Sequence, residues 1–344
     1  MRNFLNSLAG MGIFDLSALS TENWLMIIFA VLVLGFLAFD LGILHNKAEK
    51  TSTRSALFQT IFWVALSLSF GILIWFFDGD TPAIRSKNTI DYITAYLMEW
   101  ALSVDNIFII LVILRYFKVD EKYYHKILFW GILGALVMRG TFITVAWQIV
   151  SHFHFILYIF GAILIGTGYK MLNEKEDNFD PAESPVLRFA KRFLPFTDEN
   201  RNGQFVIRRN DGKRFFTPLF LVILLIETTD LIFALDSIPA VFAITQNPFI
   251  VYTSNVFAVM GLRAMFFLLA DIMDKFRYLQ RGLSFILMFI GSKMVLTLLN
   301  EPWAKSIVDI GFEIHIPAWL SLAVILVVLS GSILISLVTK ESEE

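Results

Sequence analysis

The sequence predicts an all-α, polytopic membrane protein with about nine transmembrane helices, and three observations support this fold class. The chain of 344 residues is 57% hydrophobic and 17% charged, whereas soluble domains are about 45–50% apolar and about 25% charged. Apolar runs long enough to cross the roughly 30 Å hydrocarbon core of a bilayer occur nine times. An inverted internal repeat relates two groups of three of these runs.

The apolar runs divide the chain into two membrane halves joined by a polar loop. We expect an N-terminal segment at 1–23, a first membrane half at 24–172, a loop at 173–214, a second half at 215–339 and a tail at 340–344. The predicted spans are 24–44, 56–77, 90–114, 124–149, 154–172, 216–245, 249–270, 282–299 and 317–338.

The distribution of basic residues predicts the orientation of the chain. Most of the 28 Lys and Arg residues fall in one set of alternate loops, and the opposite set carries only Arg2, Arg85, Lys87 and Lys305. Because cytoplasmic loops carry the excess of Lys and Arg, we expect the N-terminus outside and the C-terminus inside. The 173–214 loop is then cytoplasmic, either as a tether between the halves or as a regulatory or partner-binding segment.

Composition also excludes several classes of function. The chain has no Cys, which excludes disulfides, thiolate metal sites and thiol catalysis. Its net charge of −2 gives no support for nucleic-acid binding. No phosphate-binding motif of the G-x-x-x-x-G-K-[ST] type is present, so we do not expect the chain itself to use ATP.

Five acidic residues interrupt the predicted spans at depths where charge is costly. A carboxylate at the bilayer centre costs about 2.5–3.5 kcal/mol, so these groups must face the bundle interior and be paired, protonated or metal-bound. Arg139 and Arg263 can neutralise two of them, and Lys293 a third if it reaches the site. The remaining charge suits one divalent cation together with about one proton. The five acids are Glu99, Asp105, Glu227, Asp230 and Asp236.

Two of the acidic segments resemble each other. The segment 99-EWALSVDNI-107 aligns with 230-DLIFALDSI-238, so that an acid is followed six residues later by Asp in both. The next spans carry 139-RGTF-142 and 263-RAMF-266 in the same order. The third and sixth spans run in opposite directions, so the repeat is inverted and relates spans 3–5 to spans 6–8. Such repeats are typical of secondary transporters, whose substrate site lies near the midplane at the repeat interface.

Helix geometry groups some of these residues and separates others. Glu99, Ser103 and Asn106 share one face of an ideal helix, whereas Glu99 and Asp105 differ by about 120°. A single site can use both acids only if the helix is broken or the site lies among several helices. Pro239 is expected to break the sixth span, because it has no N–H to donate to the preceding turn.

Oxygen atoms dominate the donors available around the acids. Besides the carboxylates they include the amide of Asn106 and the hydroxyls of Ser103 and Ser237, and oxygen-only sites favour Mg, Ca or Mn. Asn255 is either an accessory ligand or a helix–helix contact. Lys293 joins the site, extends to the membrane surface or pairs with another acid. The acids and arginines would instead only lock helices together if no ion bound, but two arginines cannot neutralise five acids.

The same segments carry a family resemblance. MEWALSVDNIFII, IETTDLIFALDSIPAVFAIT and NVFAVMGLRAMFFLL resemble the signature segments of the TerC family of integral membrane proteins. The nine-span length is similar to that of the bacterial pH-responsive, manganese-exporting branch. The resemblance implies an exporter of Mn²⁺ in the bacterial cytoplasmic (inner) membrane, related to the LysE-type transporter superfamily. The metal-site positions that it implies are Glu99, Asp105, Asn106, Glu227, Asp230 and Asp236.

We therefore expect a secondary transporter, not an enzyme, that exports Mn²⁺ by exchange with protons. Mn²⁺ is then the transported ion, no resident cofactor is expected, and Arg139 and Arg263 balance charge when the metal is absent. Two alternatives stay open: export of another hard divalent cation such as Ca²⁺, and a non-transporting membrane scaffold linked to tellurite or metal stress. An intramembrane aspartyl protease is disfavoured, because the GxGD sequence expected around one acid is missing.

Overall fold

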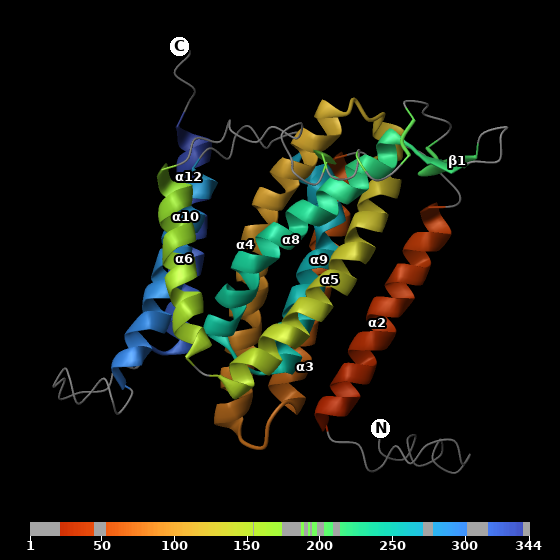
Figure 1. The fold of residues 1–344 in the computed structure, drawn as a ribbon. Helices are drawn as coiled ribbons and strands as arrows, with labels where there is room; N and C mark the ends of the chain where they lie inside the picture. The colour runs from red at the N-terminus through yellow and green to blue at the C-terminus, as the bar shows by residue number, and fades with distance from the viewer. Residues whose placement is uncertain are drawn as a thin grey trace, which may run out of the picture.

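Among the residues described in a computed structural model of the chain, nine long helices lie side by side, with a short β-hairpin at one end (Figure 1). The structure describes residues 21–44, 53–153, 155–173, 187–188, 192, 195–197, 203–208, 214–270, 278–300 and 316–339. The helices are α2 (Thr21–Leu44), α3 (Thr53–Phe77), α4 (Pro82–Tyr116), α5 (Tyr124–His152), α6 (Ile156–Asn173), α8 (Pro218–Ile244), α9 (Pro248–Leu269), α10 (Leu279–Leu296) and α12 (Ala318–Val338). Short 3₁₀ turns, η2 (Glu121–Tyr123) and η6 (Thr297–Asn300), precede α5 and follow α10.

These helices confirm the predicted fold class of a polytopic, all-α membrane protein. Among the described residues, eight helices are long and apolar enough to cross a membrane. The first predicted span corresponds to α2, a helix of 24 residues whose described apolar stretch, Trp24–Ala38, is shorter. Many large apolar side chains remain exposed on the outer faces of the bundle, as lipid contact requires.

Local sequence signals set several helix starts. Proline is the first residue of α4, α8 and α9, where its missing N–H is not needed. The hydroxyl of Thr81 accepts a hydrogen bond from the N–H of Ile84, and the Asn247 side chain accepts one from the N–H of Phe249. The Thr81 cap begins α4 eight residues earlier than the predicted span, so this helix of 35 residues is about 52 Å long at 1.5 Å per residue.

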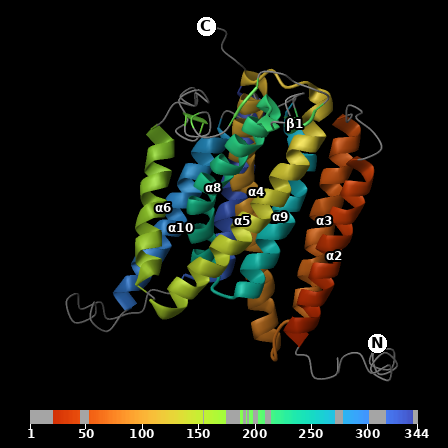
Figure 2. The same ribbon diagram turned by 45° about the vertical axis from the view of Figure 1, so that its right-hand side comes forward.

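The packing of the helices fits the predicted inverted repeat. The first repeat is α4, α5 and α6, the second is α8, α9 and α10, and α4 and α8 run in opposite directions (Figure 1). A two-fold relation that exchanges the repeats pairs α4 with α8, α5 with α9 and α6 with α10, and all three pairs are in contact. The contact of α4 with α9 has its counterpart in the contact of α8 with α5. The remaining helices lie outside this core, with α3 against α4 and α9, α2 beside α3, and α12 against α10 and α4 (Figure 2).

Helices α6 and α10 approach each other most closely, because glycine faces backbone across the contact. A Cβ atom on Gly161 would lie 2.9 Å from the carbonyl oxygen of Gly291, and one on Gly291 would lie 2.6 Å from the carbonyl oxygen of Gly161. A Cβ atom on Gly168 would lie 2.7 Å from the carbonyl oxygen of Ser284. Small residues at such crossings let helix backbones pack directly in a membrane.

The predicted break at Pro239 is wrong, because α8 continues as a helix from Pro218 to Ile244. Pro239 still lacks the N–H that would bond the carbonyl of Leu235. Proline is tolerated inside a membrane helix where neighbouring helices support the backbone. Here the turn after it, which includes Ala240, Val241 and Phe242, is fully buried by its neighbours.

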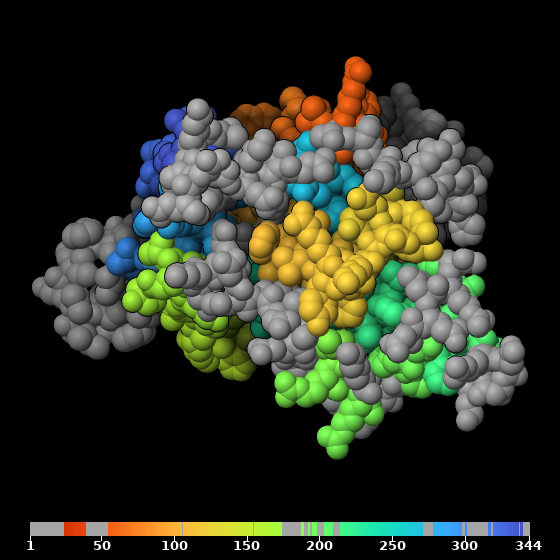
Figure 3. Space-filling view, turned by 90° about the horizontal axis from the view of Figure 1, so that it is seen from above, coloured from red at the N-terminus to blue at the C-terminus, as the bar shows by residue number. Residues whose placement is uncertain are grey.

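The described part of the loop between the halves packs against the start of α5. Strands β1 (Val206–Arg208) and β2 (Arg214–Phe216) pair antiparallel. The amine of Lys126 donates to the carbonyl of Gly203 at 2.8 Å and lies over the Phe205 ring. Seen from above, the hairpin residues lie beside the end of α4 and the start of α5 (Figure 3). The acidic first part of the predicted loop, 174–186, lies outside the described residues.

The α6–α10 crossing predicts unequal effects of two glycine substitutions. Gly291→Ala places a Cβ atom against the Gly161 carbonyl and is expected to destabilise the protein by about 1–3 kcal/mol. Gly166→Ala, on α6 with no atom within 4 Å of its added Cβ, is expected to be neutral or to stabilise by about 0.5–1 kcal/mol. Thermal unfolding in detergent measures both. Equal stability of the two variants would contradict the crossing.

Candidate functional site

A buried arginine joins one acid from each repeat. Arg139 of α5 donates from one terminal nitrogen to Oε2 of Glu99 on α4 at 2.6 Å. It also donates to both oxygens of Asp230 on α8, at 3.1 Å from Nε and 2.9 Å from the other terminal nitrogen. The side chains of Arg139 and Glu99 are 3% and 0% exposed. Two parallel bonds from one guanidinium to one carboxylate are the strongest form of this contact.

The two acids that Arg139 holds are equivalent in the repeat. Glu99 aligns with Asp230, so the guanidinium connects the same position of the two halves. Of the three helices involved, α8 packs against both α4 and α5. The ion pairs therefore lie at the interface between the repeats, where the sequence predicts the site.

The polar face predicted for α4 points at this cluster. The amide nitrogen of Asn106 donates to Oδ1 of Asp230 at 3.1 Å. Glu99, Ser103 and Asn106 are all buried, with exposed fractions of 0%, 0% and 4%. Within the described residues, Oε1 of Glu99, the hydroxyl of Ser103 and Oδ1 of Asn106 have no hydrogen-bond partner. Three oxygen atoms on one helix face are thus buried and available to a ligand.

Glu227 adds a second carboxylate from α8, one turn before Asp230. Both of its carboxylate oxygens are buried without a hydrogen-bond partner among the described residues. Gly134 of α5 makes room for it, because a Cβ atom on Gly134 would lie 2.1 Å from Oε1 of Glu227. The charges of Glu227 and Asp230 repel each other. An unpaired buried carboxylate beside another is costly, so a proton or a cation is expected to bind there.

The charges of this cluster do not cancel. Glu99, Glu227 and Asp230 against Arg139 give a formal charge of −2 when all four are ionised. A net charge in a low-dielectric interior is unfavourable until it is balanced. One divalent cation, or two protons, balances it.

A cavity adjoins the cluster on the side of the hairpin. It offers about 20 Å³ to the centre of a water molecule, which is enough to hold one. Asn106 and Asp230 line it together with largely apolar residues of α4, α5, α8 and α9. Ile110 near the end of α4 and Leu128 near the start of α5 belong to the same lining. The cavity therefore extends from the acids toward the hairpin end of the bundle.

The other predicted site residues make no described contact with Arg139. Asp236 accepts a hydrogen bond from Thr167 of α6 at 2.9 Å. Ser237 and Asn255 are buried, and an oxygen of each has no hydrogen-bond partner among the described residues. Asp105 belongs to α4, but its side chain lies outside the described part of the chain.

The two remaining predicted cations do not share the Arg139 cluster in the contacts described. Arg263 of α9 lies within electrostatic range of His125 on α5. Lys293 of α10 donates to the hydroxyl of Ser321 on α12 at 2.9 Å and lies within range of Asp91. Within the described residues, which leave out the Asp105 side chain, no three His, Asp or Glu side chains are grouped as metal ligands.

Asp91 is a buried acid that the sequence analysis missed. It lies on α4 with 1% of its surface exposed and pairs with Lys87 at 2.8 Å. The predicted third span, 90–114, includes Asp91 near its beginning. The spacing of four residues from Lys87 is the only sequence signal for the pair.

The fold and the charged cluster define a polytopic membrane protein with an inverted repeat around an intramembrane acidic site. The chain matches the TerC family of integral membrane proteins over residues 84–344 and belongs to that family. It is 41% identical to an uncharacterized membrane protein, STKORF319, of Myxococcus xanthus, over 90% of this chain and 91% of that protein. It is 40% identical to a protein of Escherichia coli K12 named putative membrane-bound redox modulator Alx, over 90% and 92% of the two chains. No solved structure matches this chain.

The ion pairs of Arg139 predict a large loss of stability when this arginine is replaced by a neutral residue. Arg139→Gln leaves Glu99 and Asp230 buried and unpaired and is expected to destabilise the protein by about 3–5 kcal/mol. The triple variant Arg139→Gln, Glu99→Gln, Asp230→Asn carries no unpaired charge at these positions and is expected to recover much of this loss. Unfolding in detergent measures the difference.

The matched control is Lys122→Gln, which breaks the exposed ion pair with Asp120. Such surface pairs contribute about 0–1 kcal/mol, so little change is expected. An Arg139→Gln variant as stable as this control would show that the acids are not held by Arg139.

Proposed function

We propose that this protein exports Mn²⁺ from the cytoplasm across the bacterial inner membrane in exchange for protons. The supporting observation is the cluster at the repeat interface, with a formal charge of −2 and several buried oxygens that lack partners. Inverted-repeat transporters bind their substrate at such an interface. The proposal makes the chain a carrier and not an enzyme.

The donor chemistry of the cluster favours a hard divalent cation. All the available donors are carboxylate, amide or hydroxyl oxygens, supplied by Glu99, Ser103, Asn106, Glu227 and Asp230. Such ligands suit Mn²⁺, Ca²⁺ and Mg²⁺. Among these ions, the TerC resemblance favours Mn²⁺. A redox role of the kind named for the Alx relatives cannot use thiols of this chain, which has no Cys.

The residues suggest how the cluster would alternate between two states. Without metal, Arg139 holds Glu99 and Asp230 and balances one of their two negative charges. A cation that arrives through the cavity beside Asn106 and Asp230 competes with the guanidinium for Asp230. Glu227 takes a proton when the cation has left, because its carboxylate is otherwise unpaired.

Orientation follows from the same arrangement. The cavity extends toward the hairpin end, which is the end with most of the Lys and Arg residues. The positive-inside rule makes this end cytoplasmic, with the N-terminus outside and the C-terminus inside. Access to the acids from this side is what export requires.

Mn²⁺ uptake into proteoliposomes or inside-out vesicles tests the proposal. Glu99→Gln, Glu227→Gln and Asp230→Asn are each expected to lower uptake at least about tenfold, because losing one charged ligand costs more than about 1.4 kcal/mol of binding. Asp120→Asn, which changes an exposed carboxylate near the start of α5, is the matched control and is expected to transport normally.

The result also separates the alternative functions. Uptake of Ca²⁺ in place of Mn²⁺, lost in the same variants, would change the ion and keep the site. Normal membrane insertion with no transport of either ion would contradict transport and favour a scaffold. Full Mn²⁺ transport in all three site variants would contradict the proposed site.

A further inference from the structure

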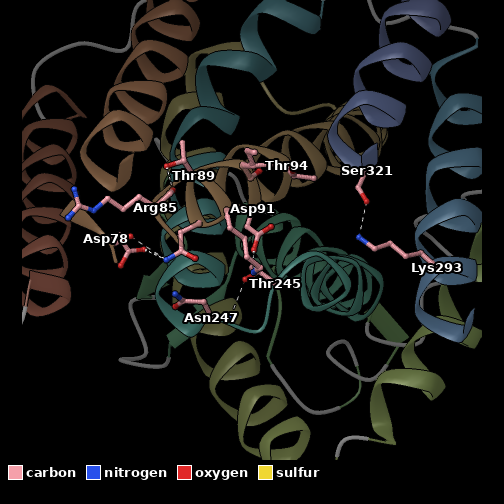
Figure 4. Close-up of polar contacts among 12 residues, drawn as sticks. Asp78, Arg85, Thr89, Asp91, Thr94, Thr245, Asn247, Lys293 and Ser321 are labelled. Atoms are coloured by element: carbon pink, nitrogen blue, oxygen red, sulfur yellow. Dashed lines mark hydrogen bonds and ion pairs between the residues drawn. The ribbon is translucent and has the colours of Figure 1, made fainter. Parts of the chain in front are cut away.

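A second polar cluster lies at the end of the bundle opposite the hairpin (Figure 4). Asp91 of α4 is fully buried, and its Oδ2 receives the amine of Lys87 at 2.8 Å from one turn earlier on the same helix. The Lys87 side chain is 66% exposed. Oδ1 of Asp91 is buried and has no hydrogen-bond partner within the described residues. Thr245, at the end of α8, lies beside Asp91 (Figure 4).

Lys293 brings another positive charge to this cluster from α10. Its amine donates to the neutral hydroxyl of Ser321 on α12 at 2.9 Å, and among the described acids Asp91 lies within its electrostatic range. The residues around it on α10, Ile290 and Met294, belong to a buried apolar cluster. Lys293 is therefore a half-buried ammonium whose described hydrogen bond goes to an uncharged group.

A count of charges identifies which group can exchange a proton at least cost. Asp91 is already balanced by Lys87, so the three groups carry +1 while Lys293 is protonated and zero when it is not. A charged lysine within the bilayer costs about 2.5–3.5 kcal/mol. Lysine can lose its proton in such a place, whereas arginine stays charged. Protonation of Asp91 beside two ammonium groups would instead raise the net charge to +2.

Two other charged groups that the structure describes at this end have partners of their own. Asp78, at the end of α3, accepts a hydrogen bond from Asn88, and Arg85 donates to the carbonyl of Gly79. Asn247 caps the start of α9. Asp91 and Lys87 are thus the charges that act on Lys293 among the described residues packed around it.

The cluster of Lys87, Asp91 and Lys293 lies where a proton would pass between the outer surface and the acidic site. Asp91 precedes Glu99 by eight residues on α4, which is about 12 Å along the helix. Lys293 and Ser321 lie near the end of α10 and the start of α12, at the same end as Asp91. In the proposed orientation this end faces outward, where the returning proton arrives.

We propose that Lys293 is a proton-exchange site at the outer end of the transporter. Its amine binds a proton from outside and releases it inward as the cation leaves, so Lys–NH₃⁺ becomes Lys–NH₂ and one proton. Asp91 is the buried counterion that stabilises the protonated form, and Ser321 accepts its hydrogen bond. This inference rests on the proposed exchange of Mn²⁺ for protons.

The test compares lysine with arginine and methionine at one position. Purified protein in proteoliposomes is given an Mn²⁺ gradient, and Mn²⁺ flux and proton movement are followed with separate dyes. Lys293→Arg keeps the charge and a donor for Ser321 but cannot release the proton, and Lys293→Met is permanently neutral. Both variants are expected to bind Mn²⁺ in detergent as the wild type does and to lose the proton movement driven by Mn²⁺. Lys122→Arg and Lys122→Met, at an exposed lysine of the opposite end, are expected to keep it.

Each outcome bears on a different claim. Proton movement that survives in Lys293→Arg would overturn the inference, because Lys293 would then only balance charge. Loss of Mn²⁺ binding in both variants would also overturn it, since Lys293 would act on the metal site or the fold. A wild type that binds no Mn²⁺ would contradict the proposed function itself. Ser321→Ala keeps the amine and is expected to remain coupled, which separates proton exchange from the hydrogen bond to α12.

Discussion

The pairing of Arg139 with Glu99 and Asp230 is the interaction on which the membrane core depends. Three hydrogen bonds pair these buried charges, and they form only where α4, α5 and α8 meet with the guanidinium between the two carboxylates. The same constraint keeps the site reactive. Glu227 enters the cluster without a positive partner, and the whole remains two charges short of neutrality. A stable helix junction and an unsatisfied site are thus two consequences of one arrangement.

Small residues position the helices that this junction requires. Gly134 leaves the space that the Glu227 carboxylate fills, so a helix–helix contact and a functional side chain share one position. In the α6–α10 pair, glycine opposite backbone brings two equivalent helices of the repeats together. Charge at the centre and close backbone packing at the side therefore stabilise the same inverted architecture. Lipid provides no hydrophobic force between helices, which makes both devices necessary.

The two polar clusters differ in a way that suits different ions. Around Arg139 the carboxylates exceed the cations, whereas around Asp91 two lysines face one carboxylate. An excess of buried oxygen acceptors attracts a metal ion, and an excess of ammonium groups favours loss of a proton. In the proposed transport cycle, the first cluster would hold the exported cation and the second would handle the proton that returns.

Hydropathy and the spacing of charged residues were enough to predict the spans, five acids within them and the repeat, although they missed Asp91. Periodicity along α4 correctly grouped Glu99, Ser103 and Asn106, because residues on one helix face keep their spacing in any fold. Pairing between helices could not be read in this way. By sequence alone, either Arg139 or Arg263 could have neutralised the acids, and it is the packing of α5 that brings Arg139 to both Glu99 and Asp230. The packing also places Asp236 against Thr167, and Lys293 against Ser321 and within range of Asp91. The sequence by itself determined which charges enter the membrane, and the tertiary structure decided which of them meet, because side-chain partners depend on helix packing and not on position along the chain.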